Sequence, residues 1–263
     1  MQIFEGESPQ RVQLANSPLV RVLCQIRFAP VLAINEESRI APIQDALRQR
    51  YPDFRREETQ LVEVGPELKR EMGVIWRLSE ADGSARISIT KDFMTVETTT
   101  YTRREHFLAR VEEAVQALEE SDLKPGFVSR IGVRYLDQVV GQDEVTIVSG
   151  LIKPEVQGML ALMTEGAANL VHNVQESLMS HSDTVVKARS IYLPGNQTID
   201  PSILEPVNEV SWILDLDAFT TQRQDFSTPE IVKTAADLAE KCHRVFHWCV
   251  NPGFLNHFGG ESI

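Results

Sequence analysis

Arginine side chains recur on the polar face of two predicted strands, and arginines placed in this way could bind an anion. Along residues 18–28, which read PLVRVLCQIRF, apolar side chains alternate with polar ones in the pattern of a half-buried strand. The central segment 127–136, FVSRIGVRYL, predicts a second strand of the same kind. Because a guanidinium offers paired N–H donors to a carboxylate or a phosphate, two such strands lying side by side would form an anion site. The predicted site consists of Arg21, Arg27, Arg130 and Arg134.

The alternative is that acidic side chains on the same face of the sheet neutralise these arginines. Cross-strand ion pairs on exposed sheet surfaces are common, contribute little to stability and give a surface of mixed charge. The sequence therefore favours neutralisation over a binding site. The candidate acidic partners are Glu97, Asp137, Asp215 and Asp217.

A second group of side chains, near the end of the chain, contains the sulfur and imidazole ligands that bind metal ions. Its members are Cys242, His243, His247, Cys249 and His257. At about 100° per residue, a helix places both cysteines in its apolar stripe, whereas His243 and His247 point away from that stripe. His243 and His247 remain weak metal-ligand candidates, but residue 244 is Arg where an HExxH site has Glu. We therefore expect no metal and no cofactor.

The sequence carries no signature of a catalytic site. His181, Ser182 and Asp183 have the residue types of a serine-hydrolase triad, but adjacent residues in a turn cannot form its relay. The motifs GxSxG, GxGxxG and GxxxxGK[ST] are absent. We expect a protein that is not an enzyme, and a hydrolase-like enzyme is the residual alternative.

The charge and the cysteines restrict the partners and the compartment. The formal net charge is −12, so the phosphates of nucleic acids and anionic membranes repel the chain, and we expect neither as a partner. The three cysteines are widely spaced and form no CxxC, which is typical of free thiols in a reducing compartment. The N-terminus does not resemble a signal peptide and no apolar stretch reaches the length of a membrane span, which predicts a cytoplasmic location.

The predicted elements follow one order twice: a strand, a helix, further strands and a long helix. Capping boxes predict the starts of the two long helices, at Thr102–Glu105 and at Ser227–Glu230. We predict an α+β protein with two similar halves, residues 1–125 and 126–263, that arose by internal duplication. Each half would pack an antiparallel sheet on its long capped helix, and the halves would join in one continuous sheet. The other predicted elements are a helix over 36–50, strands over 74–78, 85–90 and 93–99, a short helix over 155–165, a hairpin of 169–179 and 185–193, and a strand over 209–217.

Several segments give the chain a resemblance to a known family. They are the strand from Pro18 to Phe28, the segment RIGVRYLD from Arg130 to Asp137, the strand LDLD from Leu214 to Asp217, and a C-terminal helix with His243 and Phe246. In these segments the chain resembles a family of sporadically distributed bacterial proteins of about this length, known as conserved hypothetical proteins. The resemblance implies a shared fold and a bacterial setting, and it implies no activity and no catalytic residue.

Two hypotheses of function follow from the sequence. The first is a non-enzymatic binding or scaffold protein that uses the face or the edges of its sheet to bind a protein partner or a second copy of itself. The second is a protein that binds a small anionic metabolite or a nucleotide through the predicted arginine site.

Overall fold

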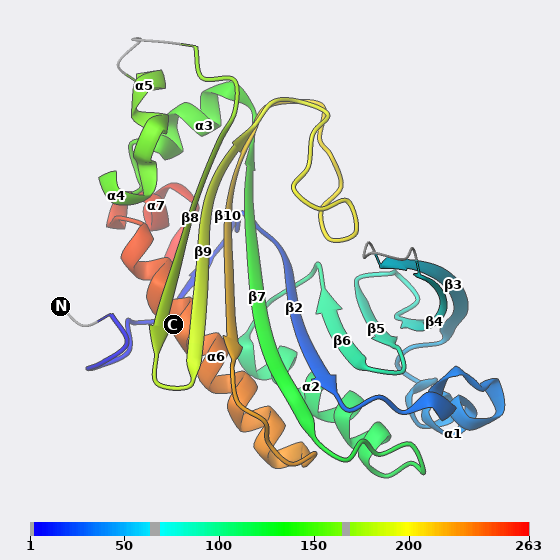
Figure 1. The fold of residues 1–263 in the computed structure, drawn as a ribbon. Coiled ribbons are helices and arrows are strands. Elements are labelled where there is room, and N and C mark those ends of the chain that lie inside the picture. The colour runs from blue at the N-terminus through cyan, green and yellow to red at the C-terminus, as the bar shows by residue number, and fades with distance from the viewer. Residues whose placement is uncertain (1–2, 64–68, 165–168, 263) are drawn as a thin grey trace. The chain divides into compact units, whose positions relative to one another are not determined.

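The computed structural model describes residues 3–63, 69–164 and 169–262. Within these residues, nine strands form one large antiparallel sheet packed with helices, in the order β3-β4-β5-β6-β2-β7-β10-β9-β8 (Figure 1). A separate pair consists of β1 (Val12–Leu14) and β11 (Gly260–Ser262). The predicted α+β class and the large antiparallel sheet are therefore confirmed. Among the described residues, no helix is both long enough and apolar enough to cross a membrane.

Two compact units divide the chain, and each is described by itself. Unit 1 comprises Met1–Val20, Arg134–Ala218 and Ala239–Ile263, and unit 2 comprises Arg21–Val133 and Phe219–Leu238. The predicted division into residues 1–125 and 126–263 and the predicted duplication stay predictions. The elements with residues in both units are β2 (Leu19–Phe28), β7 (Val128–Val140), β10 (Ser211–Thr220) and α6 (Thr228–Cys249).

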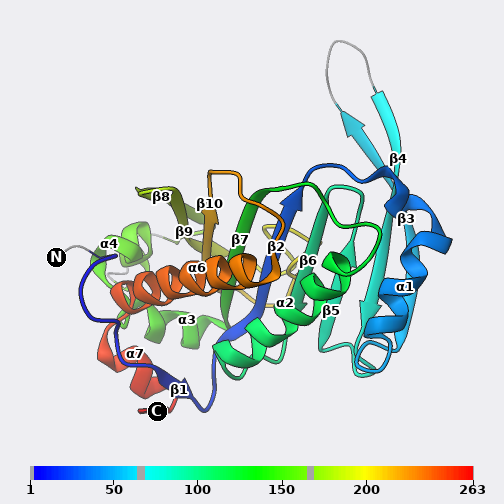
Figure 2. The same cartoon turned by 90° about the horizontal axis from the view of Figure 1, so that it is seen from below.

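Unit 2 packs helices against one face of its strands because apolar side chains alternate along them. In β2, Val22, Cys24 and Ile26 are buried, and the side chains between them, Leu23 and Gln25, are partly exposed. The helix α2 (Arg104–Glu119) buries Phe107 and Val111 at helical spacing, and it lies across that face of the sheet (Figure 2). The other elements of unit 2 are η1 (Leu32–Asn35), α1 (Glu37–Leu47), β3 (Asp53–Glu63), β4 (Lys69–Ser79), β5 (Ala85–Ile89) and β6 (Phe93–Thr98).

Unit 1 has a core that contains Trp212 of β10. The indole Nε1 of Trp212 donates a hydrogen bond to Ser190 Oγ at 3.0 Å, and its ring contacts the ring of Phe254 with centroids 6.3 Å apart. Both aromatic side chains are buried, and the hydrogen bond satisfies the buried indole donor. The other elements of unit 1 are α3 (Gln142–Ser149), α4 (Pro154–Gln157), η2 (Gly158–Leu160), α5 (Ala161–Thr164), β8 (Asn173–His181), β9 (Thr184–Leu193) and α7 (Pro252–His257).

The structure corrects two predictions about helices. The capping box at Thr102 is wrong: α2 has Arg103 as its N-cap without a side-chain bond, and the Thr102 hydroxyl forms a hydrogen bond with His106 Nδ1 at 3.0 Å. The short helix predicted over 155–165 is broken at Gly158, whose φ of 50° lies in the left-handed region that glycine tolerates. Residue 165 itself lies outside the described residues.

Candidate functional site

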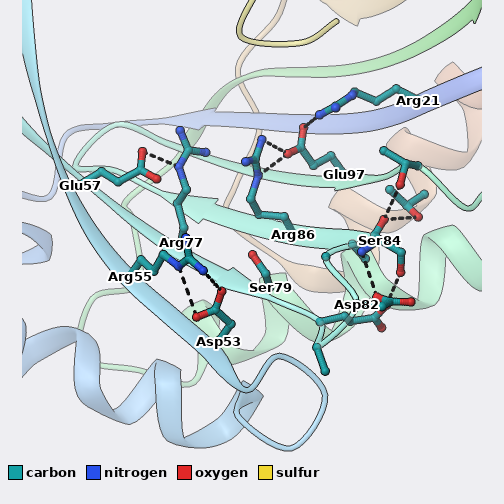
Figure 3. Close-up of a pocket in the computed structure, with 16 residues that line it drawn as sticks. Arg21, Asp53, Arg55, Glu57, Arg77, Ser79, Asp82, Ser84, Arg86 and Glu97 are labelled. Atoms are coloured by element: carbon teal, nitrogen blue, oxygen red, sulfur yellow. Dashed lines mark hydrogen bonds and ion pairs between the residues drawn. The ribbon is translucent and has the colours of Figure 1, made fainter. Parts of the chain in front are cut away.

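A charged pocket opens on the sheet face of unit 2 opposite its buried side. The cavity measures about 410 Å³, and strands β2 to β6 together with the β4–β5 turn line it (Figure 3). Such a volume is in the range of small-molecule sites, although the lining here is far more polar than is usual for them. The basic side chains that line the pocket are Arg21, Arg55, Arg77 and Arg86.

The strand register explains why these arginines share one face. Arg86 of β5 lies opposite Glu97 of β6, and Arg77 of β4 lies opposite both Ser88 of β5 and Arg55 of β3. Residues directly opposite each other in a sheet point to the same side, so the charged side chains gather on one face. The alternate positions of these strands are buried on the other face, at Leu78, Ile87 and Val96.

Two of the arginines share a single carboxylate. Arg21 Nη1 donates to Glu97 Oε2 at 3.1 Å, and Arg86 Nε and Nη2 both contact Glu97 Oε1. The Glu97 side chain is 10% exposed, whereas Arg86 is 32% and Arg21 19% exposed. One carboxylate neutralises one guanidinium, so this group carries a surplus positive charge.

The other two arginines each have an acidic partner of their own. Arg77 Nε lies 2.7 Å from Glu57 Oε2, and Arg55 Nη2 lies 2.9 Å from Asp53 Oδ2. On the strands of the pocket, four guanidiniums therefore face the three carboxylates of Glu57, Asp53 and Glu97, a charge of 4 − 3 = +1 for the strands alone; the β4–β5 turn adds two further carboxylates to the lining.

Two acidic residues at the rim have partners away from the strands. Glu80 accepts hydrogen bonds from Arg110 and Arg50, and Asp82 Oδ1 accepts one from the backbone N–H of Ser84 at 2.9 Å. These contacts hold both carboxylates in or beside the β4–β5 turn.

Several guanidinium donors on the floor of the pocket are unused. Arg86 Nη1, Arg77 Nη2 and Arg21 Nη2 donate no hydrogen bond to any described residue. The guanidiniums of Arg77 and Arg86 lie next to each other and extend from the sheet in the same direction (Figure 3). An anion placed between them would accept hydrogen bonds from two charged donors at once.

No family model matches the chain, and no curated protein matches it. The resemblance to sporadically distributed bacterial proteins accordingly stays a prediction, and the geometry of the residues carries the functional argument.

The predicted arginine site is only partly present in this pocket. Arg21 lines it, whereas Arg27 donates from Nε to Gln25 Oε1 at 3.2 Å, and the Arg130 guanidinium lies over the Phe219 ring at 4.2 Å from its centroid. The other three pocket arginines are not among the site residues predicted from the sequence. Two of them, Arg77 and Arg86, occupied polar positions of predicted strands, which was the available signal.

The fourth predicted arginine, Arg134, belongs to an acid-centred cluster in unit 1. Its Nε and Nη2 donate to the two carboxylate oxygens of Asp215 at 2.7 and 2.9 Å, and Arg189 also donates to Asp215. The Asp215 side chain is fully buried. Burial lowers the pKa of Arg134. The hydrogen bonds and the charge of Asp215, followed by the charges of Asp217 and Asp200, outweigh burial, so the pKa is raised. Asp215 and Glu97 thus act as the neutralising carboxylates that the sequence analysis considered.

Asp137, a further candidate partner of the arginines, is buried and pairs with none of them. It forms no hydrogen bond or ion pair with a described residue, and burial raises its pKa to about 7. The nearby Cys249 thiol is also buried, and burial raises its pKa to about 12. A carboxyl group in this environment is largely protonated below neutral pH.

The histidines predicted as weak metal ligands are close together. The rings of His243 and His247 have centroids 4.5 Å apart, and His243 Nε2 lies 3.2 Å from the carbonyl oxygen of Pro9. Burial, and then the charge of His243, lowers the pKa of His247 to about 4. Across the part of the chain that the structure describes, no group of three or more His, Cys, Asp or Glu side chains is arranged to hold a metal ion.

Proposed function

We propose that the protein is a binding protein that takes up a small anionic ligand in the pocket of unit 2. The observation that carries this proposal is the sharing of Glu97 by Arg21 and Arg86, which leaves a surplus guanidinium charge and unused N–H donors. A phosphate or a carboxylate group has the charge and the acceptor oxygens to use both.

The pocket favours a small and strongly polar ligand. Its volume of about 410 Å³ fits a metabolite or a mononucleotide, and its lining offers hydroxyl groups beside the guanidiniums, as at Ser79 and Ser84. The anionic group would bind between Arg77 and Arg86, where Nη2 of the first and Nη1 of the second have no acceptor among the described residues.

A thermal-shift and calorimetry experiment tests the proposal. The probes are inorganic phosphate, citrate and ATP, and a bound probe raises the melting temperature by mass action. Arg86→Met and Arg77→Met should each remove the rise, whereas Arg27→Met, an exposed arginine outside the pocket, should keep it. A rise that survives Arg86→Met, or three probes without effect on the wild-type protein, would contradict the proposal.

We also infer that the chain arose by internal duplication, because one acid-centred arrangement occurs once in each unit. In each case a carboxylate on the strand before a long helix accepts from arginines on the two neighbouring strands. A strand, one or more helices, further strands and a long helix also follow one another twice along the chain, with the four strands β3 to β6 in the first run and the three strands β8 to β10 in the second. The two arrangements are Arg21–Glu97–Arg86 on β2, β6 and β5, and Arg134–Asp215–Arg189 on β7, β10 and β9.

A further inference from the structure

Strand β8 is the outermost strand of unit 1 and has an open edge (Figure 1). It pairs with β9 on one side through nine residues, Asn173 to His181, and no described strand pairs with its other side. Such an edge presents unpaired backbone N–H and C=O groups, which are a template for another strand.

The side chains of β8 do not protect this edge in the usual way. Proteins generally place charges or proline on exposed edges, and the opposite edge strand β3 begins with Asp53, Arg55, Arg56 and Glu57. On β8, by contrast, Val174 is 50% and Leu178 63% exposed. The two lie at alternate positions, so they share one face of the strand.

The other face of β8 is covered in part, with Ser177 exposed at its centre. Gln175 Nε2 donates to the carbonyl oxygen of Glu155 at 2.6 Å, and the His181 ring lies tilted by 35° against the Phe4 ring with centroids 5.4 Å apart. These residues occupy the odd-numbered positions, which point away from the face of Val174 and Leu178. An approaching strand would therefore meet open backbone and a face on which Val174 and Leu178 are exposed on either side of Glu176.

We propose that a second copy of this chain pairs with β8, antiparallel, through its own β8. In the register that uses all nine residues, the two-fold axis passes Ser177, and Asn173 lies opposite His181 of the second copy. Glu176 then lies opposite Leu178 of the second copy, and Val174 lies opposite Ser180. This register brings no like charges directly opposite each other, which would oppose pairing.

Charge complementarity supports a second copy as the occupant. Glu176 and Lys187 have no ion-pair partner among the described residues, and Lys187 lies opposite Leu178 in the β8–β9 register. Self-pairing therefore places Lys187 of one copy in the same row as Glu176 of the other, two strands away. At about 4.8 Å per strand, the two long side chains can meet across Leu178, and symmetry repeats the contact.

The mass of the protein in solution tests this inference. Sedimentation equilibrium over a wide concentration range should show a reversible monomer–dimer equilibrium, because a single strand pair is a small interface. Leu178→Glu places a carboxylate opposite Glu176 at two symmetric positions and should weaken the dimer roughly tenfold. Ile147→Glu, on the exposed side of α3, is the matched control and should leave the equilibrium unchanged.

A charge exchange gives the second arm of the test. Glu176→Lys alone and Lys187→Glu alone should each weaken the dimer, and the double variant should recover it. Circular dichroism melting curves show whether each variant is folded. A wild-type chain that is monomeric at every concentration, a dimer that Leu178→Glu leaves intact, or a double variant without recovery overturns the inference. The anion pocket is in unit 2, so its ligand-binding test is independent of this result.

Discussion

Glu119 at the end of α2 caps the first turn of α6 at Thr228. Its Oε2 accepts a hydrogen bond from the backbone N–H of Thr228 at 2.8 Å and another from the hydroxyl of Thr228 at 2.6 Å. The backbone N–H groups of a first helical turn have no partner within their own helix. A carboxylate from outside therefore satisfies one of them, and its negative charge also interacts favourably with the positive end of the helix dipole. The contact fixes the start of α6 against the end of α2 within unit 2.

We predict that Glu119→Gln lowers the free energy of unfolding by about 1 kcal/mol at pH 7. The hydrogen bonds from Thr228, and then that from Lys124, lower the pKa of Glu119 to about 2. A carboxyl group whose pKa is lowered in the folded state stabilises the protein at pH values above its ordinary pKa, here 4.5. This stabilisation is lost as the pH falls toward 2. Urea denaturation at pH 7 and at pH 3 should therefore show a difference between wild type and variant that shrinks with acid.

The matched control for this prediction is Glu112→Gln, an exposed position on the same helix. It should leave the unfolding free energy within about 0.5 kcal/mol of the wild type. A Glu119→Gln protein as stable as this control would show that the cap at Thr228 contributes nothing.

We predict that Asp137→Asn stabilises the protein in neutral and alkaline solution. Burial raises the pKa of Asp137 to about 7, so the folded state holds a proton that the unfolded state releases at lower pH. A raised carboxyl pKa makes stability fall as the pH rises from the ordinary value of 3.8 to about 7, by at most about 4 kcal/mol in total. The melting temperature of the variant relative to the wild type should therefore increase between pH 4 and pH 8.

The exposed Asp143 on α3 provides the control, because Asp143→Asn should show no such trend with pH. If wild type and Asp137→Asn lose or gain stability in parallel from pH 4 to pH 8, the carboxyl of Asp137 is ionised in the folded state, contrary to this prediction.

The sequence was sufficient to predict the elements whose side chains alternate regularly. In β2 and β10, apolar and polar residues alternate over most of the strand, and both strands were found. β3 was missed because it begins DFRREE, a charged run in which the period of two is not visible. The sequence predicts that the Thr102 side chain caps the start of α2. In the structure the Thr102 hydroxyl forms a hydrogen bond with the His106 side chain and caps no backbone N–H group.

The site was harder to predict than the fold because it depends on strand pairing over long distances. Arg21 and Glu97 are 76 positions apart in the chain, and their contact requires β6 to lie next to β2. Composition and periodicity predict which face of the sheet a side chain occupies, but they do not predict which strand lies beside it. Arg77 and Arg86 could therefore be placed on polar faces, while the pocket that they form with Arg55 of the unpredicted β3 could not.

We predict that Asp215 is more important for stability than any single arginine around it. Asp215 is fully buried and accepts hydrogen bonds from Arg134 and Arg189, which are 12% and 20% exposed. Asp215→Ala would leave two largely buried guanidiniums without a counter-charge, and it should cost about 3 kcal/mol or more. Arg189→Met should cost less, since Arg134 still pairs with the carboxylate. Urea denaturation of both variants measures the difference, and an equal or smaller loss for Asp215→Ala would refute the prediction.

We predict that Glu97 competes with a bound anion for the guanidiniums of Arg21 and Arg86. Glu97→Gln removes this competition and changes the local charge of the pocket floor from 4 − 3 = +1 to 4 − 2 = +2. The affinity for inorganic phosphate, measured by titration calorimetry at low salt, should therefore rise roughly tenfold. The gain should shrink as the salt concentration increases, because ions screen a partly exposed charge. Glu113→Gln, outside the pocket and also paired with an arginine, is the control and should leave the affinity unchanged. A loss of affinity in Glu97→Gln would mean that Glu97 positions the arginines for the ligand instead of competing with it.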